Sequence, residues 1–193
     1  PFRADTLGAD LISVSGHKLN APKGVGALYI GPRCRAVRPL LAGGGQERGL
    51  RSGTEATAQI AGFAKAVELY CDGLDEKRRH LAAVRDYCRE RLLSIPTVAE
   101  IGRGDAPHIL SVSLPGYPSA NIVADLGAQG ICISAGSACH KGKASHVVSA
   151  LGLDKKTAAG VIRVSFGTET TFEEIDALHD ALLAHKNSRF PML

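Results

Sequence analysis

Residues 10–30, DLISVSGHKLNAPKGVGALYI, form the stretch that most constrains the fold. Asp10–Ser15 is a short apolar run rich in β-branched residues, and Gly26–Ile30 is a second short apolar run. The segment between them is too dense in glycine, proline and asparagine for a helix, so it predicts a turn joining two strands. Lys18 lies in this turn, where a strand end beside glycine can desolvate the amine and make it a nucleophile or a base. An ordinary surface lysine in a loop is the alternative at this point.

The next segments predict a loop followed by two helices. Residues 39–53 (PLLAGGGQERGLRSG) indicate an extended loop, and Thr54 followed by Glu55 predicts a helix N-cap. This loop could bind a phosphate through its glycines, its arginines and Thr54 at the start of the helix. A flexible loop is the simpler interpretation. Residues 75–93 predict a second helix, because apolar residues recur along one face at Leu81, Val84, Tyr87, Cys88 and Leu92.

The remaining residues predict shorter, alternating elements of an α+β segment. We expect a domain boundary near residues 94–97, which gives one domain over residues 1–94 and a second over residues 95–193. The tail after Asn187 is expected to fray. The expected strands are 98–101, 109–114, 131–134 and 161–166, and the expected helices are 119–128, 144–151 and 172–185.

Two later segments carry candidate chemistry. Cys139 follows Ala135-Gly136-Ser137-Ala138, whose small side chains leave the thiol uncrowded, and neighbouring His140 and Lys141 favour a thiolate. Arg163 lies in an expected strand and would face away from the core if Ile162 and Val164 are buried. There it could bind a carboxylate ligand, and an ordinary solvent-facing strand residue is the alternative. Cys71, Cys88 and Cys132 are interpreted as packing residues, and His80, His179 and His185 as solvent-facing residues on helices.

Composition excludes several classes of protein. The 193 residues are 45% hydrophobic and 22% charged, which is typical of a globular protein. The net charge of +4 and an aromatic content of 5% argue against nucleic-acid binding. No apolar run approaches the roughly 20 residues of a membrane helix, so no membrane association is expected. Five cysteines without CxxC spacing favour free thiols in a reducing compartment over disulfides or a metal site.

Four ordered motifs together resemble the cysteine desulfurases of the class V aminotransferase family. The motifs are residues 15–18 with 22–29, residues 43–49 with 51–54, residues 134–139, and residues 163–167. The resemblance implies an α/β fold of the aspartate-aminotransferase type (fold type I of the enzymes that use pyridoxal 5'-phosphate, PLP). By the same resemblance the chain would hold the end of the large PLP-binding domain and a small C-terminal domain with the cysteine loop.

The resemblance also implies a role for each matching residue. Lys18 would form the Schiff base with PLP and shuttle the substrate α-proton, while Ser15 and His17 would hold the PLP phosphate. Thr54 would reach the phosphate of the other subunit in a homodimer. Arg163 would bind the α-carboxylate of L-cysteine. Cys139 would take the sulfur as a persulfide and pass it to an acceptor protein, in iron–sulfur cluster assembly, tRNA thiolation or another pathway.

Pro1 in place of an initiator methionine favours a fragment of a longer reading frame. Since the resemblance implies that the N-terminal half of the family is missing, we expect weak PLP binding and no activity until that half is supplied. The segment from residue 140 to residues 151–153 looks shorter than in the relatives with the longest loops. A shorter loop would limit how far Cys139 can reach toward a sulfur acceptor. A cytoplasmic location is expected.

Selenocysteine lyase is an alternative with the same fold, and a non-catalytic fragment that binds partners is another. The presence of Lys18, Cys139 and Arg163 together argues against loss of function. A general aminotransferase is disfavoured, because its chemistry needs no exposed loop thiol.

Overall fold

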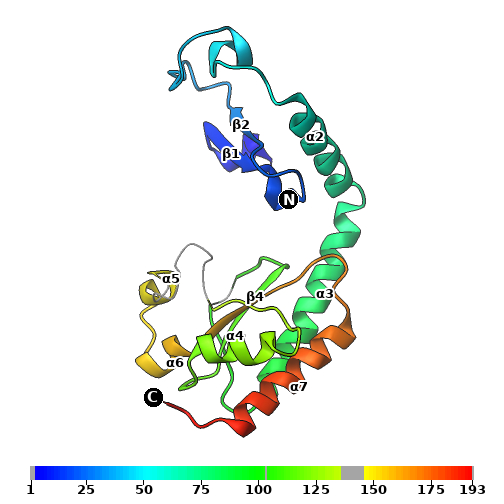
Figure 1. Cartoon of the computed structure of the whole chain (residues 1–193), viewed down its shortest axis with the longest axis vertical. Helices are drawn as coiled ribbons and strands as arrows, with labels where there is room; N and C mark the ends of the chain where they lie inside the picture. Colours follow the sequence, from blue (N-terminus) through cyan, green and yellow to red (C-terminus); the bar gives the residue numbers. More distant parts are fainter. Residues whose placement is uncertain (1–2, 103, 136–145, 193) are drawn as a thin grey trace. The chain divides into compact units, whose positions relative to one another are not determined.

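The structure is a computed structural model that describes residues 3–102, 104–135 and 146–192 (Figure 1). The chain forms two compact units, Pro1–Leu74 and Asp75–Leu193. The long helix α3 (Leu74–Leu93) begins at the last residue of the first unit and otherwise belongs to the second. The domain boundary expected near residue 94 stays a prediction.

The first unit is built on a hairpin. Strand β1 (Leu11–Ser15) pairs antiparallel with β2 (Gly26–Ile30), with Leu11 opposite Ile30 and Ser15 opposite Gly26. The two predicted strands and the turn between them are therefore confirmed. A short helix α1 (Ala4–Leu7) precedes the hairpin, and α2 (Thr57–Cys71) follows it along the chain (Figure 1).

The first unit has no apolar core of its own. None of the hydrophobic side chains at residues 3–74 is buried, and Leu28, Tyr29, Ile60 and Tyr70 are among the exposed ones. A two-stranded hairpin is at best marginally stable in water without a further layer. Among the described residues, the buried hydrophobic side chains lie in the second unit, so hydrophobic burial stabilises that unit and not the first.

The second unit packs helices against a three-stranded antiparallel sheet. The sheet order is β3 (Ala99–Glu100), β4 (Ile109–Ser113) and β5 (Val161–Ser165), and β4 is central. Helices α3, α4 (Ser119–Gly127) and α7 (Phe172–Ser188) supply most of the other core side chains (Figure 1). Ile95, Leu114, Tyr117 and Phe166 join the core from connecting segments. The fully buried members are Val84, Cys88, Leu92, Val112, Leu114, Ile122, Leu126, Ile162 and Leu182.

Local sequence signals explain where several of these elements begin. Thr171 and Glu174 form a capping box at the start of α7: Glu174 N donates to Thr171 Oγ1 and Thr171 N donates to Glu174 Oε2. The apolar face predicted for α3 is confirmed, because Val84, Cys88 and Leu92 are buried.

Other predictions about the elements are wrong. Thr54 is not an N-cap: α2 begins three residues later, and Ala56 caps it with no side-chain hydrogen bond. Residues 131–134 do not form the predicted strand: only Ser134 pairs with β5, in an isolated bridge to Arg163. Helix α5 (His146–Ala150) confirms the described part of the helix predicted over residues 144–151, whereas α6 (Lys155–Ala159) was not predicted.

The C-terminal tail is also more ordered than predicted. Tyr117 Oη donates to the carbonyls of Lys186 and Arg189, and Met192 N donates to the carbonyl of Gly116. None of the helices in the described ranges is both long and apolar enough to cross a membrane.

Candidate active site

Lys18 lies in a tight turn at the end of β1. Residues Gly16–Leu19 form a single 3-10 turn, and Gly16 N donates to the carbonyl of Val25 at 2.9 Å. A Cβ at Gly16 would lie 2.8 Å from Val25 O, so only glycine allows this close approach. Ser15 ends β1, and His17 and Lys18 lie in the turn that follows it. The side chains of all three residues are exposed.

Helix α2 contacts this turn. A Cβ built at Gly62 of α2 would lie 3.0 Å from Pro22 Cγ, and α2 packs against residues 16–19. The absence of a side chain at position 62 therefore lets the helix approach the segment that follows Lys18.

The glycine-rich loop that precedes α2 is held by its own hydrogen bonds. Ser52 Oγ donates to the carbonyls of Leu41 and Ala42, both at 3.2 Å, and Gly53 N donates to Gln46 Oε1 at 3.3 Å. The backbone at Glu47 and Arg48 has positive φ angles of 50° and 58°, which is uncommon for residues other than glycine. Thr54 is exposed at the end of this ordered loop, in the same unit as Lys18.

Arg163 occupies the middle of β5 in the second unit. Ile162 and Val164 on either side are buried in the core, so the side chain of Arg163 points to the opposite face of the sheet. This is the orientation that the sequence predicts if those two neighbours are buried. Arg163 Nε is buried and has no hydrogen-bond partner among the residues that the structure describes. An unpartnered buried guanidinium N–H is costly, and a carboxylate would satisfy it with a charge-assisted hydrogen bond.

The backbone of Arg163 also positions a residue that the sequence did not assign to the site. Arg163 N donates to Ser134 O at 2.7 Å, and Ser134 N donates to Arg163 O at 3.1 Å. Ser134 precedes the undescribed segment by two residues. No sequence signal identifies this pair, because the pairing of distant segments is set by the fold.

Cys139, the expected sulfur acceptor, lies outside the described residues. Of the other cysteines, Cys88 is buried, and its burial raises the thiol pKa to about 12, so that thiol stays protonated at neutral pH. Cys88 is therefore a packing residue, as predicted. Cys71 and Cys132 are exposed, so their interpretation as packing residues is wrong.

The structure groups the predicted residues by unit. Ser15, His17, Lys18 and Thr54 belong to the first unit, and Arg163 belongs to the second. Within the first unit, one turn holds an amine next to a hydroxyl and an imidazole. Within the second, a strand holds a guanidinium whose buried Nε has no partner among the described residues.

Residues 1–178 match the model of the aminotransferase class-V family, and the chain belongs to that family. A cysteine desulfurase of Trichormus azollae is 37% identical over 188 residues, which cover 94% of this chain and 46% of the relative. The cysteine desulfurase IscS of Dictyoglomus turgidum is 38% identical, over 94% of this chain and 47% of the relative.

The fold is also found among solved structures. A NifS-like protein superposes with a TM-score of 0.85 at 34% identity, over 97% of this chain and 49% of that protein. The predicted class, fold type I of the PLP-dependent transferases, is confirmed. The chain spans about half the length of the curated relatives that it matches.

Proposed function

We propose that this chain is part of a PLP-dependent cysteine desulfurase, which converts L-cysteine to alanine and leaves a persulfide on Cys139. The observation that carries the proposal is the buried Nε of Arg163, which has no hydrogen-bond partner among the described residues. Arg163 lies on a strand bonded to Ser134, five residues before the cysteine in sequence. Similarity to desulfurases over 94% of the chain supports it. A carboxylate-binding residue near a loop thiol suits an amino-acid substrate whose sulfur is removed.

The turn at residues 15–18 has the chemistry to hold PLP. Lys18 supplies an exposed amine at a fixed strand end, and Ser15 and His17 supply polar groups for a phosphate. PLP itself would supply the electron sink that stabilises negative charge on the substrate carbon. The role of Lys18 is to bind the cofactor and to move a proton at the substrate α-carbon.

Arg163 would orient the substrate. Its planar guanidinium can form two parallel hydrogen bonds with the α-carboxylate, which fixes the direction of the thiol as well as its position. Lysine could match the charge but not this geometry. Arg163 therefore positions L-cysteine for both proton transfer and sulfur removal.

Cys139 would act as the nucleophile. Its thiolate attacks the sulfur of bound L-cysteine, the S–S bond of the persulfide forms and the substrate C–S bond breaks. The electron pair left on carbon takes up a proton, which completes alanine. Transfer of the outer sulfur to a thiol of an acceptor protein then restores Cys139.

We also propose that the working enzyme contains additional polypeptide. The first unit has no buried hydrophobic side chain among residues 3–74, and the relatives are about twice as long. The completed enzyme, meaning this chain together with the remaining length, would be a homodimer in which Thr54 contacts the phosphate bound by the other subunit. A cytoplasmic site is proposed because Cys34, Cys71, Cys88 and Cys132 are free thiols.

Borohydride reduction followed by peptide mass analysis tests the proposal on the completed enzyme isolated from its source. We expect a pyridoxyl group on Lys18 in the reduced sample and, in a second sample incubated with L-cysteine and left unreduced, an extra sulfur on Cys139. Lys18→Ala should remove the pyridoxyl label, whereas Lys23→Ala, five residues further along an exposed loop, should retain it. A label on another lysine, or none, would contradict the proposal.

A further inference from the structure

Two serines flank Arg163 on its face of the sheet. Ser111 of β4 lies directly opposite Arg163, and Ser134 lies opposite it on the other side, in the isolated bridge. Residues that are directly opposite in an antiparallel pair project from the same face of the sheet. The side chains of both serines therefore share the face on which Arg163 lies. Neither side chain has a role in the reaction as proposed above.

The backbone hydrogen bonds bring Ser111 close to Arg163. The N–H and the carbonyl of Arg163 both bond to Ser134, so the polar groups of its backbone point away from β4. The carbonyl of Ser111 likewise points away from β5, because it accepts from Ile101 N at 2.9 Å. Ser111 and Arg163 are therefore a non-hydrogen-bonded pair, in which the two Cα atoms lie only about 4.5 Å apart and the side chains are closest.

The burial of these three residues places their polar groups at the sheet surface. Arg163 is half-buried and its Nε is buried, which indicates that the side chain lies against the sheet and does not extend into solvent. Ser111 and Ser134 are also half-buried, so neither is sealed in the core. Each hydroxyl can rotate to donate a hydrogen bond. One face of the sheet thus carries two O–H donors beside a guanidinium.

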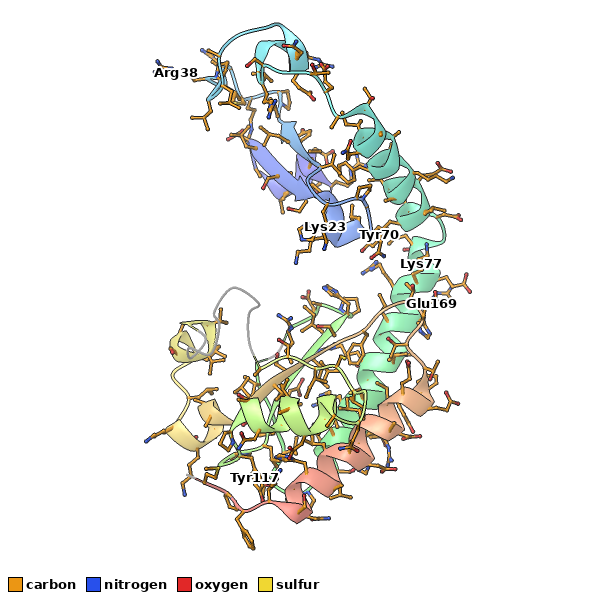
Figure 2. All side chains as sticks on the ribbon, viewed as in Figure 1. Lys23, Arg38, Tyr70, Lys77, Tyr117 and Glu169 are labelled. Atoms are coloured by element: carbon orange, nitrogen blue, oxygen red, sulfur yellow. The ribbon has the colours of Figure 1, made fainter. Side chains whose placement is uncertain are left out.

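No acidic side chain of β3, β4 or β5 shares this face with Arg163. Glu100 of β3 is opposite the buried Val112 and so lies on the core face, where it accepts from Arg89 of α3 at 2.7 Å. Glu169, the next acid after Arg163 along the chain, lies in the loop that follows β5 (Figure 2). The described strands therefore supply no carboxylate that would compete with a ligand for Arg163.

We propose that Ser111 and Ser134 donate hydrogen bonds to the substrate α-carboxylate that Arg163 binds, and that they set the preference for ligands with this group. The inference rests on the proposed function, because it takes Arg163 as the residue that binds L-cysteine. A carboxylate offers about four acceptor sites, of which a guanidinium fork uses two. The hydroxyls would use the remaining sites without adding a charge.

Calorimetric titration of the completed enzyme with L-alanine and L-alaninol tests the proposal. L-alaninol keeps the amine and the methyl group of L-alanine but has a hydroxymethyl group in place of the carboxylate. We expect Ser111→Ala to weaken L-alanine binding about tenfold and L-alaninol binding less than about twofold, because the lost hydrogen bond is to a charged group. Ser134→Ala should have the same effect. Equal weakening of both ligands would indicate a structural role and overturn the proposal.

Matched variants provide the controls. Ser111→Thr keeps the hydroxyl and should retain most of the affinity for L-alanine. Ser165→Ala, at an exposed serine two positions further along β5, should leave both affinities unchanged. Thermal melting checks that each variant is folded.

The parent enzyme separates this inference from the function on which it rests. If the parent binds L-alanine and both alanine variants bind it equally tightly, the role of the serines is wrong, whereas the desulfurase proposal stands. If the parent carries no pyridoxyl group on Lys18 and binds neither ligand, both proposals are wrong. With L-cysteine as substrate, we expect Ser111→Ala to raise KM about tenfold and to change kcat much less.

Discussion

Arg163 and Ser134 exchange two backbone hydrogen bonds, 2.7 Å from Arg163 N to Ser134 O and 3.1 Å from Ser134 N to Arg163 O. This exchange connects the proposed carboxylate-binding strand to the segment that leads to Cys139. Cys139 follows Ser134 by five residues in the sequence. The pairing therefore fixes the start of the segment that carries the proposed nucleophile.

Replacement of Arg163 should weaken substrate binding. In the completed enzyme, Arg163→Ala should cost about 2–5 kcal/mol of binding free energy, seen as a higher KM for L-cysteine, because a desolvated charge pair is lost. Arg163→Lys should recover only part of the loss, since lysine lacks the planar fork. Steady-state kinetics with thermal melting as a folding control provide the measurement. Unchanged saturation by L-cysteine in Arg163→Ala would remove this residue from the site.

Replacement of Cys139 should separate cofactor binding from sulfur transfer. Cys139→Ser should abolish persulfide formation, because a hydroxyl does not accept the sulfur, while the PLP absorbance of the completed enzyme is retained. Cys132→Ser is the matched control, since Cys132 is an exposed cysteine of the same unit. Mass analysis after incubation with L-cysteine measures both. Persulfide formation in Cys139→Ser would show that another thiol is the nucleophile.

Substitution of Gly16 should disrupt the turn that carries Lys18. A Cβ at this position would lie 2.8 Å from the backbone oxygen Val25 O, which cannot move without shifting β2. We expect Gly16→Ala to destabilise the completed enzyme by about 1–3 kcal/mol and to lower its PLP content. Gly45→Ala, where a Cβ meets nothing within 4 Å, should have little effect. Urea unfolding and cofactor absorbance compare the two variants, and equal stabilities would contradict the steric argument.

Acid should weaken the junction between α3 and α7. Tyr87 Oη donates to Asp176 Oδ1 at 2.8 Å, and Arg91 Nε donates to the same oxygen at 2.7 Å. The hydrogen bond from Tyr87 and the charge of Arg91 lower the pKa of Asp176. Since the folded-state pKa lies below the unfolded value, this contribution is present above about pH 4 and is lost as the pH falls through the folded-state pKa.

Asp176→Asn tests this dependence. The variant should be less stable than the parent at pH 7, and the difference should shrink as the pH falls from about 4 through the lowered folded-state pKa of Asp176, where the parent carboxylate becomes protonated. Asp180→Asn, at an exposed acid one turn further along α7, is the control for the loss of one charge. Urea midpoints measured across this pH range should separate the two variants, and parallel curves would contradict the assignment.

Local patterns predicted much of the fold correctly. The two short apolar runs and the turn residues between them predicted β1, β2 and the turn, because these signals act over a few residues. The apolar spacing of α3 predicted its buried face for the same reason. Thr54 is not the cap, because the loop continues past it and α2 begins only at Thr57.

The sequence by itself determined the family and the two strands that flank Lys18, because ordered motifs and short-range spacing are written along the chain. Tertiary structure decided which of these groups are buried and paired. His185 looked like a solvent-facing helix residue, yet packing of α7 against α4 buries it beside Asp125. The burial of Arg163 Nε, which has no partner among the described residues, and the backbone hydrogen bonds between Arg163 and Ser134 likewise depend on strand pairing between distant segments. Burial arises from contacts between elements far apart in sequence, and local pattern does not encode those contacts.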